Sequence, residues 1–455
     1  MRRQITRQDQ ARGSHEFPSV IASVIIALLV YLLTDLSIYS SIGVGLTIYA
    51  LIQYVEALGK SAAILQMTLL IAVLQLILGP IISYQLGTVH TKYRMYVPEQ
   101  TYMPFAVSGM LAFALGLKVF KSNIDIKKMF QNIQSYKIPK SIPYLFIFIG
   151  ITSNVASSFV PSAIAFVFFL FGQFQFIAIC YLFATRSRSR WTVGALVMVV
   201  SFFISAEEGV FHNIILWAGL IFSFVCMQAR LTRLQKYAVL AVGAFALSSL
   251  QSVKADFRDE LWSGQVSGSA GLVLIAMMGG GDRPEEVQGV SQLEKLNIRL
   301  NQGWVVSAVM QYVPQSRPFA GGATIKDAVA DSLLPRFLFA KREVLVGDAF
   351  REYTGLPLGG STSIGIGLLG EAWANYGWWG WVLMGAWGAV LSGTMALIVR
   401  YSKYLPTLVL WSPFLFLMAI KAETELAMTL NYLLKSSVFL ALLYGLLRRV
   451  FGIKF

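Results

Sequence analysis

The chain has very little cysteine and histidine for its length. Its 455 residues include 2 cysteines, Cys180 and Cys226, and 3 histidines, His15, His90 and His212. Both cysteines lie in apolar runs and the histidines are far apart in the sequence. Neither a disulfide framework nor a cysteine or histidine metal site is therefore supported. We expect no metal and no other cofactor.

Charged residues are also scarce, at 13% of the chain, whereas hydrophobic residues make up 56%. This composition is too apolar for a soluble globular protein. The apolar runs reach about 20 residues, the length that a helix needs to cross the hydrocarbon layer of a membrane. The alternating pattern of a membrane barrel is absent. The sequence therefore predicts an all-α polytopic protein that lies in a lipid bilayer.

We expect about twelve transmembrane helices. A polar, basic stretch at residues 1–17 precedes a first span of full length, which indicates a cytoplasmic tail and not a cleaved signal peptide. The predicted spans lie near 18–36, 39–58, 62–84, 101–120, 142–159, 162–184, 191–206, 210–228, 237–252, 377–399, 405–421 and 434–450. The chain thus divides into a tail at 1–17, nine spans within 18–252, a large loop at 253–363, a short helix and three spans within 364–450, and a second tail at 451–455.

Basic residues gather in alternate connections between these spans. The set consists of Lys60; Lys121, Lys127, Lys128, Lys137 and Lys140; Arg186, Arg188 and Arg190; Arg230, Arg233 and Lys236; Arg400 and Lys403; and Arg448, Arg449 and Lys454. Because short cytoplasmic loops are enriched in Lys and Arg, we expect both termini in the cytoplasm and residues 253–363 on the outer face. The same loops explain the net charge of +14 without a nucleic-acid partner.

The outward-facing segment carries its own helix signals. Apolar residues recur at helical spacing over 287–312, and Pro314 should end this first helix. Thr324 and Asp327 have the spacing of a capping box, which predicts the start of a second helix. A short third helix is expected at 364–375, capped by the serine and threonine residues before it. We expect the first two helices to lie on the outer surface and to cover a cavity between the spans.

Basic residues of this segment are the first candidates for ligand binding. They are Lys254, Arg258, Arg299, Arg317, Arg336 and Arg342. Acidic residues bring the net charge of the segment close to zero, so an ordinary solvated surface explains many of these charges. Arginine nevertheless suits phosphate, because its planar guanidinium donates paired hydrogen bonds and stays charged when partly desolvated. We expect at least two members of the set to face the cavity.

Polar residues at the outer ends of the spans are the second group of candidates. They are Glu371 in the short helix, His212, Glu423, Glu425 and Asn431. Such residues are costly next to lipid and are often functional, although a hydrogen bond to a neighbouring helix would also explain His212. A carboxyl group in apolar surroundings has a raised pKa, as a general base requires. Glu371 is the strongest candidate for that role.

Three stretches resemble a known family. They are Arg299–Trp304 (RLNQGW), Leu334–Phe337 (LPRF) and Thr362–Gly377 (TSIGIGLLGEAWANYG). In them the chain resembles bacterial oligosaccharide repeat-unit polymerases, that is, O-antigen or exopolysaccharide polymerases of the Wzy type. The resemblance covers roughly the last 200 residues in motif and the whole chain in layout. It implies a GT-C-like membrane fold in the bacterial inner membrane.

The resemblance also implies a reaction and its partners. Undecaprenyl-pyrophosphate-linked oligosaccharides would be donor and acceptor, and a chain-length regulator would be a protein partner. The acceptor hydroxyl would attack the anomeric carbon of the donor, and lipid pyrophosphate would leave. On this sequence, Arg258, Arg299, Arg317 and Arg336 would form a metal-independent cradle for pyrophosphate. Glu371 would be the base or would position the acceptor.

Two other functions fit part of this pattern. An O-antigen ligase, which transfers the finished glycan to a lipid A core, would share the same features. A lipid-linked oligosaccharide flippase belongs to a different class and also has about twelve or more spans. The long structured outer segment and the lack of paired broken helices argue against a flippase. The polar clusters at the outer face argue against a purely structural scaffold.

Overall fold

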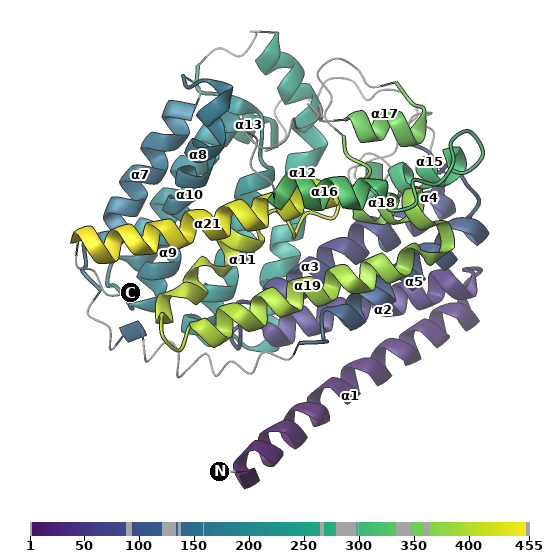
Figure 1. The fold of residues 1–455 in the computed structure, drawn as a ribbon, viewed down its shortest axis with the longest axis horizontal. Coiled ribbons are helices and arrows are strands. Elements are labelled where there is room, and N and C mark those ends of the chain that lie inside the picture. Colours follow the sequence, from purple (N-terminus) through teal and green to yellow (C-terminus); the bar gives the residue numbers. More distant parts are fainter. Residues whose placement is uncertain are drawn as a thin grey trace.

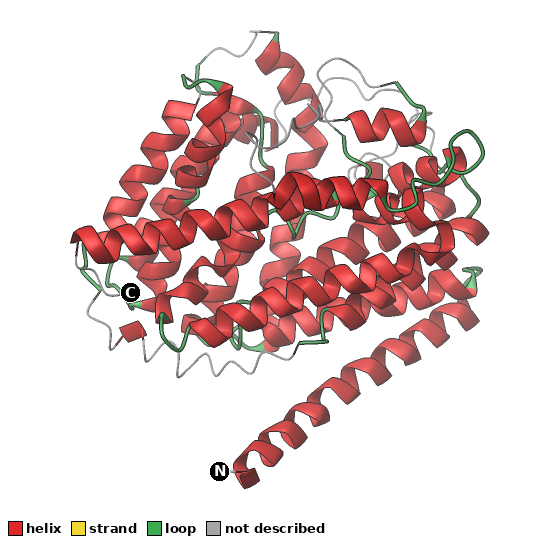
Figure 2. Ribbon diagram, viewed as in Figure 1, coloured by secondary structure: helices red, strands yellow, loops and turns green. Residues whose placement is uncertain are grey.

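The chain is helical throughout the part that the structure describes. The computed structural model describes residues 2–87, 93–120, 133–134, 138–157, 159–263, 268–278, 297–298, 300–333, 347–357 and 364–451. Figure 2 shows helices and loops in these ranges, where the single pairing of extended backbone is an isolated bridge between Leu58 and Ser61. The predicted all-α class is therefore confirmed for the described residues.

The helices follow one another along the whole chain (Figure 1). They are α1 (Arg2–Leu33), α2 (Ile38–Ala57), α3 (Ile64–Val73), α4 (Gly79–Leu86), α5 (Glu99–Gly116), α7 (Ile142–Ser157), α8 (Ser162–Gly172), α9 (Phe174–Ala184), α10 (Arg190–Glu208), α11 (His212–Ala229), α12 (Arg233–Trp262), α13 (Ala270–Met278), α15 (Gly303–Tyr312), α16 (Ala323–Leu333), α17 (Asp348–Thr354), α18 (Gly367–Tyr376), α19 (Gly380–Tyr401), α20 (Ser412–Phe416) and α21 (Leu426–Phe451). Shorter turns join some of them: the π-helical η1 (Leu74–Leu78) and the 3₁₀-helical η2 (Gly377–Trp379) and η3 (Pro406–Trp411).

Seven helical segments of the described chain are long and apolar enough to cross a membrane. They are Ile38–Ala57, Ile64–Leu86, Ile164–Ala184, Arg190–Glu208, His212–Ala229, Gly367–Tyr401 and Leu426–Arg449. Each overlaps one of the twelve predicted spans. The other five predicted spans also overlap helices: α1, α5, α7, α12 and the η3–α20 segment. These are shorter or more polar by the same measure, so length and composition support a polytopic membrane protein with at least these seven candidate spans.

The tightest helix pair is α5 with α19. Gly388 of α19 meets the backbone of α5 directly, since a Cβ atom there would lie 2.5 Å from the carbonyl oxygen of Phe113. The Ser392 hydroxyl donates a 3.0 Å hydrogen bond to the carbonyl oxygen of Gly116. Small residues let membrane helices approach this closely, so that backbone packing holds them together where lipid offers no hydrophobic advantage.

Helix α1 lies at one edge of the bundle. Figure 1 shows its first residues projecting beyond the other helices, with the second half running beside α2. Gly45 of α2 admits the backbone of α1, because a Cβ atom at this position would lie 2.8 Å from the carbonyl oxygen of Ser23. The large apolar residues in this half of α1, such as Val24 and Leu28, are exposed, as expected of a helix that faces lipid.

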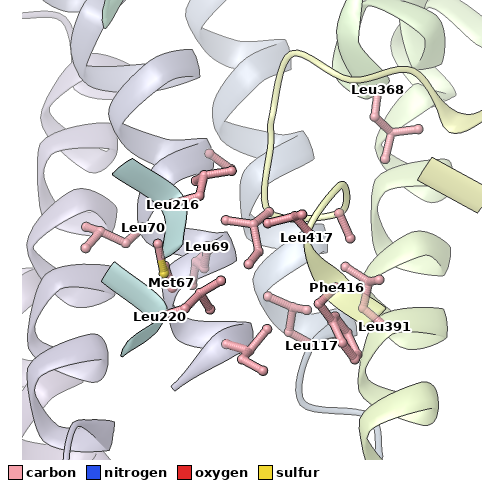
Figure 3. Packing of buried hydrophobic residues seen from close by; sticks show 14 of the residues in the cluster. Met67, Leu69, Leu70, Leu117, Leu216, Leu220, Leu368, Leu391, Phe416 and Leu417 are labelled. Carbon is pink, nitrogen blue, oxygen red and sulfur yellow. The ribbon is translucent and has the colours of Figure 1, made fainter. Parts of the chain in front are cut away.

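Buried apolar side chains hold the segment between α20 and α21 in the centre of the bundle. Figure 3 shows Phe416 and Leu417 beside Leu391 of α19, with Met67 of α3 and Leu220 of α11 nearby. All five are less than a tenth exposed. This packing matters for function because the chain that continues from Leu417 carries the polar residues described below.

The first helix of the outward segment differs from the prediction. One continuous helix over 287–312 was expected on the surface, but the helical backbone is interrupted at Asn301 and Gln302, and α15 begins at Gly303. The side chain of Asn301 accepts a 3.2 Å hydrogen bond from the Trp304 amide, which starts a new helix there. Helix α15 is also buried over its first eight residues, so it is a core element and not a surface cover. Residues 279–296, including the first part of the predicted helix, lie outside the described residues.

The other two helices also begin differently from the prediction. Helix α16 starts at Ala323, so Thr324 lies inside it, and its hydroxyl bonds to Glu371 in place of the predicted capping box. Helix α18 starts at Gly367 and not at residue 364, while the residues predicted to cap it, 361–363, lie outside the described chain. Helix α16 lies against α21 (Figure 1).

Candidate functional site

Glu371 joins three helices at one end of the bundle. Its side chain extends from α18 and is 4% exposed. One carboxylate oxygen accepts a 2.7 Å hydrogen bond from the Thr324 hydroxyl of α16, and the other accepts a 2.9 Å bond from the Leu426 amide at the start of α21. A carboxylate at a helix N-terminus satisfies an amide that lacks a partner within the helix. Glu371 therefore fixes α16 and α21 against α18.

Asn375, one turn after Glu371, extends this network. Its side-chain amide donates to the Thr324 hydroxyl at 2.7 Å and to the Glu371 carbonyl oxygen at 2.8 Å. Its side-chain oxygen accepts a 2.9 Å bond from the amide of Gly322. No local signal in the sequence indicates that Thr324 is a partner of Asn375, because the two residues are 51 positions apart.

Glu425 lies beside this junction, just before α21. One of its oxygens accepts a 3.2 Å hydrogen bond from the amide of Ile366. Gly365 and Gly367 let the backbone pass close by: Gly367 has φ +64, and a Cβ atom on it would lie 2.8 Å from the carbonyl oxygen of Ala422. Burial, opposed by the Ile366 amide and assisted by the charge of Glu371, raises the pKa of Glu425 from 4.5 to about 7. Glu425 is thus partly buried and titrates near neutral pH.

Glu423 and His212 form the next part of the site. The Nε2 atom of His212, the first residue of α11, lies 3.7 Å from Oε1 of Glu423. Lys421 lies two residues before Glu423, and its charge and that of Lys254 of α12 both act on the His212 imidazole. The amino group of Lys254 also lies 5.9 Å from the centre of the Phe211 ring. The structure thus brings together α11, α12 and the segment before α21.

Two narrow pockets adjoin these polar groups and share Leu76 and Ala422 in their lining. The first is mostly apolar, lies between α3, α5 and α19, and has Lys421 in its wall. The second is lined in part by Gln302 and Glu423. The amide of Gln302 donates a 3.0 Å bond to a carbonyl oxygen of the π-helical turn η1. Polar and apolar linings therefore meet at the segment that carries Lys421 and Glu423.

Two arginines of the predicted cradle, Arg258 and Arg317, lie among the described residues, and they make separate contacts. Arg258 donates a 2.8 Å hydrogen bond to the carbonyl oxygen of Gly209. Arg317 bonds to Glu352, and its guanidinium lies 4.8 Å from the centre of the Tyr353 ring. The contacts of these two arginines share no residue. The other two predicted members of the cradle, Arg299 and Arg336, lie outside the described residues, as does the substrate-binding candidate Arg342.

Asn431 lies on α21, beyond Glu425. Its side-chain oxygen is buried and has no hydrogen-bond partner among the described residues. The residues that sequence reasoning left out of the predicted site are Lys421 and Thr324. Lys421 could have been recognised from the sequence, because it is the first of three charged residues at every second position, followed by Glu423 and Glu425.

Within the described ranges, no group of three or more His, Cys, Asp or Glu residues is arranged to hold a metal ion. No protein-family model, no curated protein and no solved structure matches the chain. The chemistry of the site must therefore carry the functional argument. Glu425 is suited to accept a proton near neutral pH, and Lys421 and Lys254 are suited to attract an anion. The membrane helices suit a substrate with a lipid part.

Proposed function

We propose that the protein is a glycosyltransferase that polymerises undecaprenyl-pyrophosphate-linked oligosaccharide repeat units into O-antigen or exopolysaccharide. The observation that carries the proposal is the placement of Glu425, whose pKa is raised to about 7 chiefly by burial, beside the buried Glu371. A general base is most effective when its pKa lies near the working pH. The resemblance of Thr362–Gly377 to the polymerase family supports the same activity.

The reaction needs no group beyond side chains. The acceptor hydroxyl attacks the anomeric carbon of the donor with inversion, and the bond from that carbon to the pyrophosphate oxygen breaks. The hydroxyl proton passes to the Glu425 carboxylate, and the electron pair of the broken bond leaves with the lipid pyrophosphate. Arginines stabilise the charge that develops on this leaving group, for which Arg299 and Arg336 are the proposed catalytic pair.

We assign Glu371 to positioning rather than to proton transfer. Both of its oxygens already accept hydrogen bonds, from Thr324 and from the Leu426 amide. The Glu371 carboxylate is also only 4% exposed, which leaves little room for an acceptor hydroxyl beside it. Glu371 instead orients the start of α21 and, through it, Glu425. Arg258 and Arg317 complete the proposed set as substrate-binding residues at the outer face.

The proposal includes a GT-C-like arrangement of twelve spans in the bacterial inner membrane. Both termini lie in the cytoplasm and the site opens to the outer face. This topology follows from the distribution of basic residues between the spans. A chain-length regulator is the proposed protein partner. The twelve segments on which the topology rests all overlap helices in the described chain.

Reconstitution with purified components tests the proposal. The protein in detergent is given undecaprenyl-pyrophosphate-linked repeat units, and the products are separated by length. Long polymer is expected, and E425Q should slow its formation by at least about 100-fold because the base is lost. E56Q is the matched control, because Glu56 lies at the C-terminal end of α2, where it pairs with Arg233.

The same experiment separates the alternatives. Polymer formed in detergent, without sealed vesicles, cannot come from a flippase. A ligase would consume finished glycan only when a lipid A core acceptor is added, and would make no polymer from repeat units. Persistence of long polymer in both R299A and R336A would remove those two arginines from the proposed cradle.

A further inference from the structure

We propose that His212, Lys254 and Lys421 form a second anion site, which binds the phosphate next to the first sugar of a lipid-linked substrate. The identity of the lipid rests on the proposed function, whereas phosphate binding by these residues can be measured without any turnover. No part of the predicted cradle included Lys421.

The three residues come from different elements that tertiary packing brings together. His212 is the first residue of α11, Lys254 lies in the last part of α12, and Lys421 lies between α20 and α21. The histidine is tied to the third element by the 3.7 Å approach of its Nε2 atom to Glu423. The 5.9 Å distance from the Lys254 amino group to the Phe211 ring places that lysine beside the start of α11. Three elements therefore converge on one point.

Two polar atoms at this point are buried without a hydrogen bond. Neither Nε2 of His212 nor Oε2 of Glu423 has a hydrogen-bond partner within the described part of the chain. Buried polar atoms are nearly always satisfied by protein, water or ligand. A phosphate oxygen would accept from His212, and a sugar hydroxyl would donate to Glu423. A phosphate that carries a sugar would satisfy both atoms at once.

The charges around His212 also favour a ligand that contains phosphate. Lys421 and Lys254 bring two positive charges close to the imidazole, and Oε1 of the Glu423 carboxylate lies 3.7 Å from its Nε2 atom. Lysine binds phosphate as a point charge and needs no fixed planar geometry. The neighbouring carboxylate weakens the attraction for a free anion but provides an acceptor for the hydroxyls of a sugar. The combination favours a sugar phosphate over a simple phosphate.

The surroundings favour a lipid-linked form of that ligand. Lys421 borders the mostly apolar packing between α3, α5 and α19, where the cavity is only about 30 Å³. A ligand held here would therefore have its phosphate at the boundary between polar and apolar surroundings. A polyprenyl phosphate has this boundary in its own structure.

Binding measurements on the purified full chain in an uncharged detergent test the inference. The probes are farnesyl pyrophosphate, inorganic pyrophosphate and phosphatidylglycerol, and affinity is measured by titration calorimetry. We expect K421M and K254M each to weaken binding of farnesyl pyrophosphate by about tenfold, because each removes a charge-assisted hydrogen bond. K421R should restore most of the affinity. K403M, at an exposed lysine on the turn after α19, is the matched control and should leave the affinity unchanged.

Substitution of Glu423 tests whether its negative charge weakens the binding of phosphate. E423Q removes a negative charge beside the phosphate, so farnesyl pyrophosphate, which has no sugar, should bind several-fold more tightly. If the residues were only structural, E423Q and K421M would both weaken binding by loosening the same contacts. Weaker binding in E423Q, or unchanged binding in both K421M and K254M, would therefore overturn the inference. Thermal unfolding of each variant verifies that the protein is folded.

The choice of probes identifies the source of the phosphate. Tighter binding of farnesyl pyrophosphate than of inorganic pyrophosphate or phosphatidylglycerol supports a polyprenyl-linked ligand, and equal binding of all three overturns that assignment. The outcome is also distinct from that of the polymerisation assay. If the protein binds farnesyl pyrophosphate through the two lysines but makes no polymer, the anion site stands and the proposed reaction is wrong.

Discussion

Thr324 and Glu371, 47 positions apart in the sequence, are joined by a 2.7 Å hydrogen bond. The bond links α16 of the outward segment to α18, and the second carboxylate oxygen of Glu371 links α18 to α21 through the Leu426 amide. One buried carboxylate thus links α16, α18 and the start of α21, next to the proposed base Glu425. Loss of this carboxylate should therefore lower the stability of the fold, whatever its effect on the reaction.

We expect E371Q and T324V to destabilise the protein by about 1–3 kcal/mol each, because each leaves a buried polar group without a partner. Thermal unfolding in detergent measures the effect. T394V is the matched control, since the Thr394 hydroxyl bonds only within α19 and is exposed. In the double variant the losses should not add, because both changes remove the same bond. Additive losses would show that the two residues act independently.

The titration of Glu425 predicts how activity depends on pH. Because burial raises its pKa to about 7, polymer formation should increase as pH rises through about 7 and then level off as the base becomes ionised. Initial rates between pH 5.5 and about 8.5 measure this limb. The small activity that remains in E425Q should no longer rise with pH over this range. An unchanged pH profile in E425Q would assign the proton acceptor to another group.

The same shift predicts the opposite trend for stability. The pKa of Glu425 is raised from 4.5 to about 7 on folding, so the folded chain binds this proton more tightly than the unfolded chain. Its contribution to stability is therefore fully present below pH 4.5 and is lost as pH rises through 7. The difference in unfolding temperature between the native protein and E425Q, measured across this range, should change in that direction. A constant difference would contradict the shift.

The crossing of α5 and α19 should tolerate no side chain. We expect G388A to destabilise the protein by about 1–3 kcal/mol, because the added methyl group meets the backbone of α5 at Phe113. Thermal unfolding measures the change. G445A is the matched control: Gly445 also lies in a membrane helix, but nothing within 4 Å would meet its Cβ atom. Equal behaviour of the two variants would mean that the close approach is unimportant.

Cysteine labelling tests the proposed orientation. Both natural cysteines are buried, so single exposed cysteines can be introduced after their replacement. A membrane-impermeant maleimide should label K326C, on the outward α16, in intact cells with a permeable outer membrane. It should label K403C only after the inner membrane is opened. The reverse pattern would invert the topology and place the proposed site in the cytoplasm.

Much of the fold was predictable because helix periodicity and apolar length are local signals. All twelve predicted spans overlap helices, and seven of the helical segments meet a strict measure of length and composition. The start of α15 was missed because Asn301, which caps the Trp304 amide, lies inside a run whose apolar spacing continues without a break. Thr324 was assigned to a capping box because its spacing to Asp327 matches one, but its hydroxyl bonds to Glu371.

The candidate site was predictable in part. Glu371, Glu423, Glu425 and His212 were recognised because ionisable residues are rare beside apolar spans. Which of them meet was not predictable. The approach of His212 to Glu423 and the support of Glu425 by the Ile366 amide join segments separated by tens to hundreds of residues. No periodicity carries that information.

The sequence by itself determined that this chain is a helical membrane protein with polar groups at one end of its spans. That outcome follows from hydrophobicity, which acts on each segment separately and fixes how long and how apolar a spanning helix must be. Only the tertiary structure decided the surroundings of those polar groups. It satisfied both oxygens of Glu371, raised the pKa of Glu425 by burial, and set Lys421 near His212. These properties depend on what surrounds each side chain, and packing between distant segments determines those surroundings.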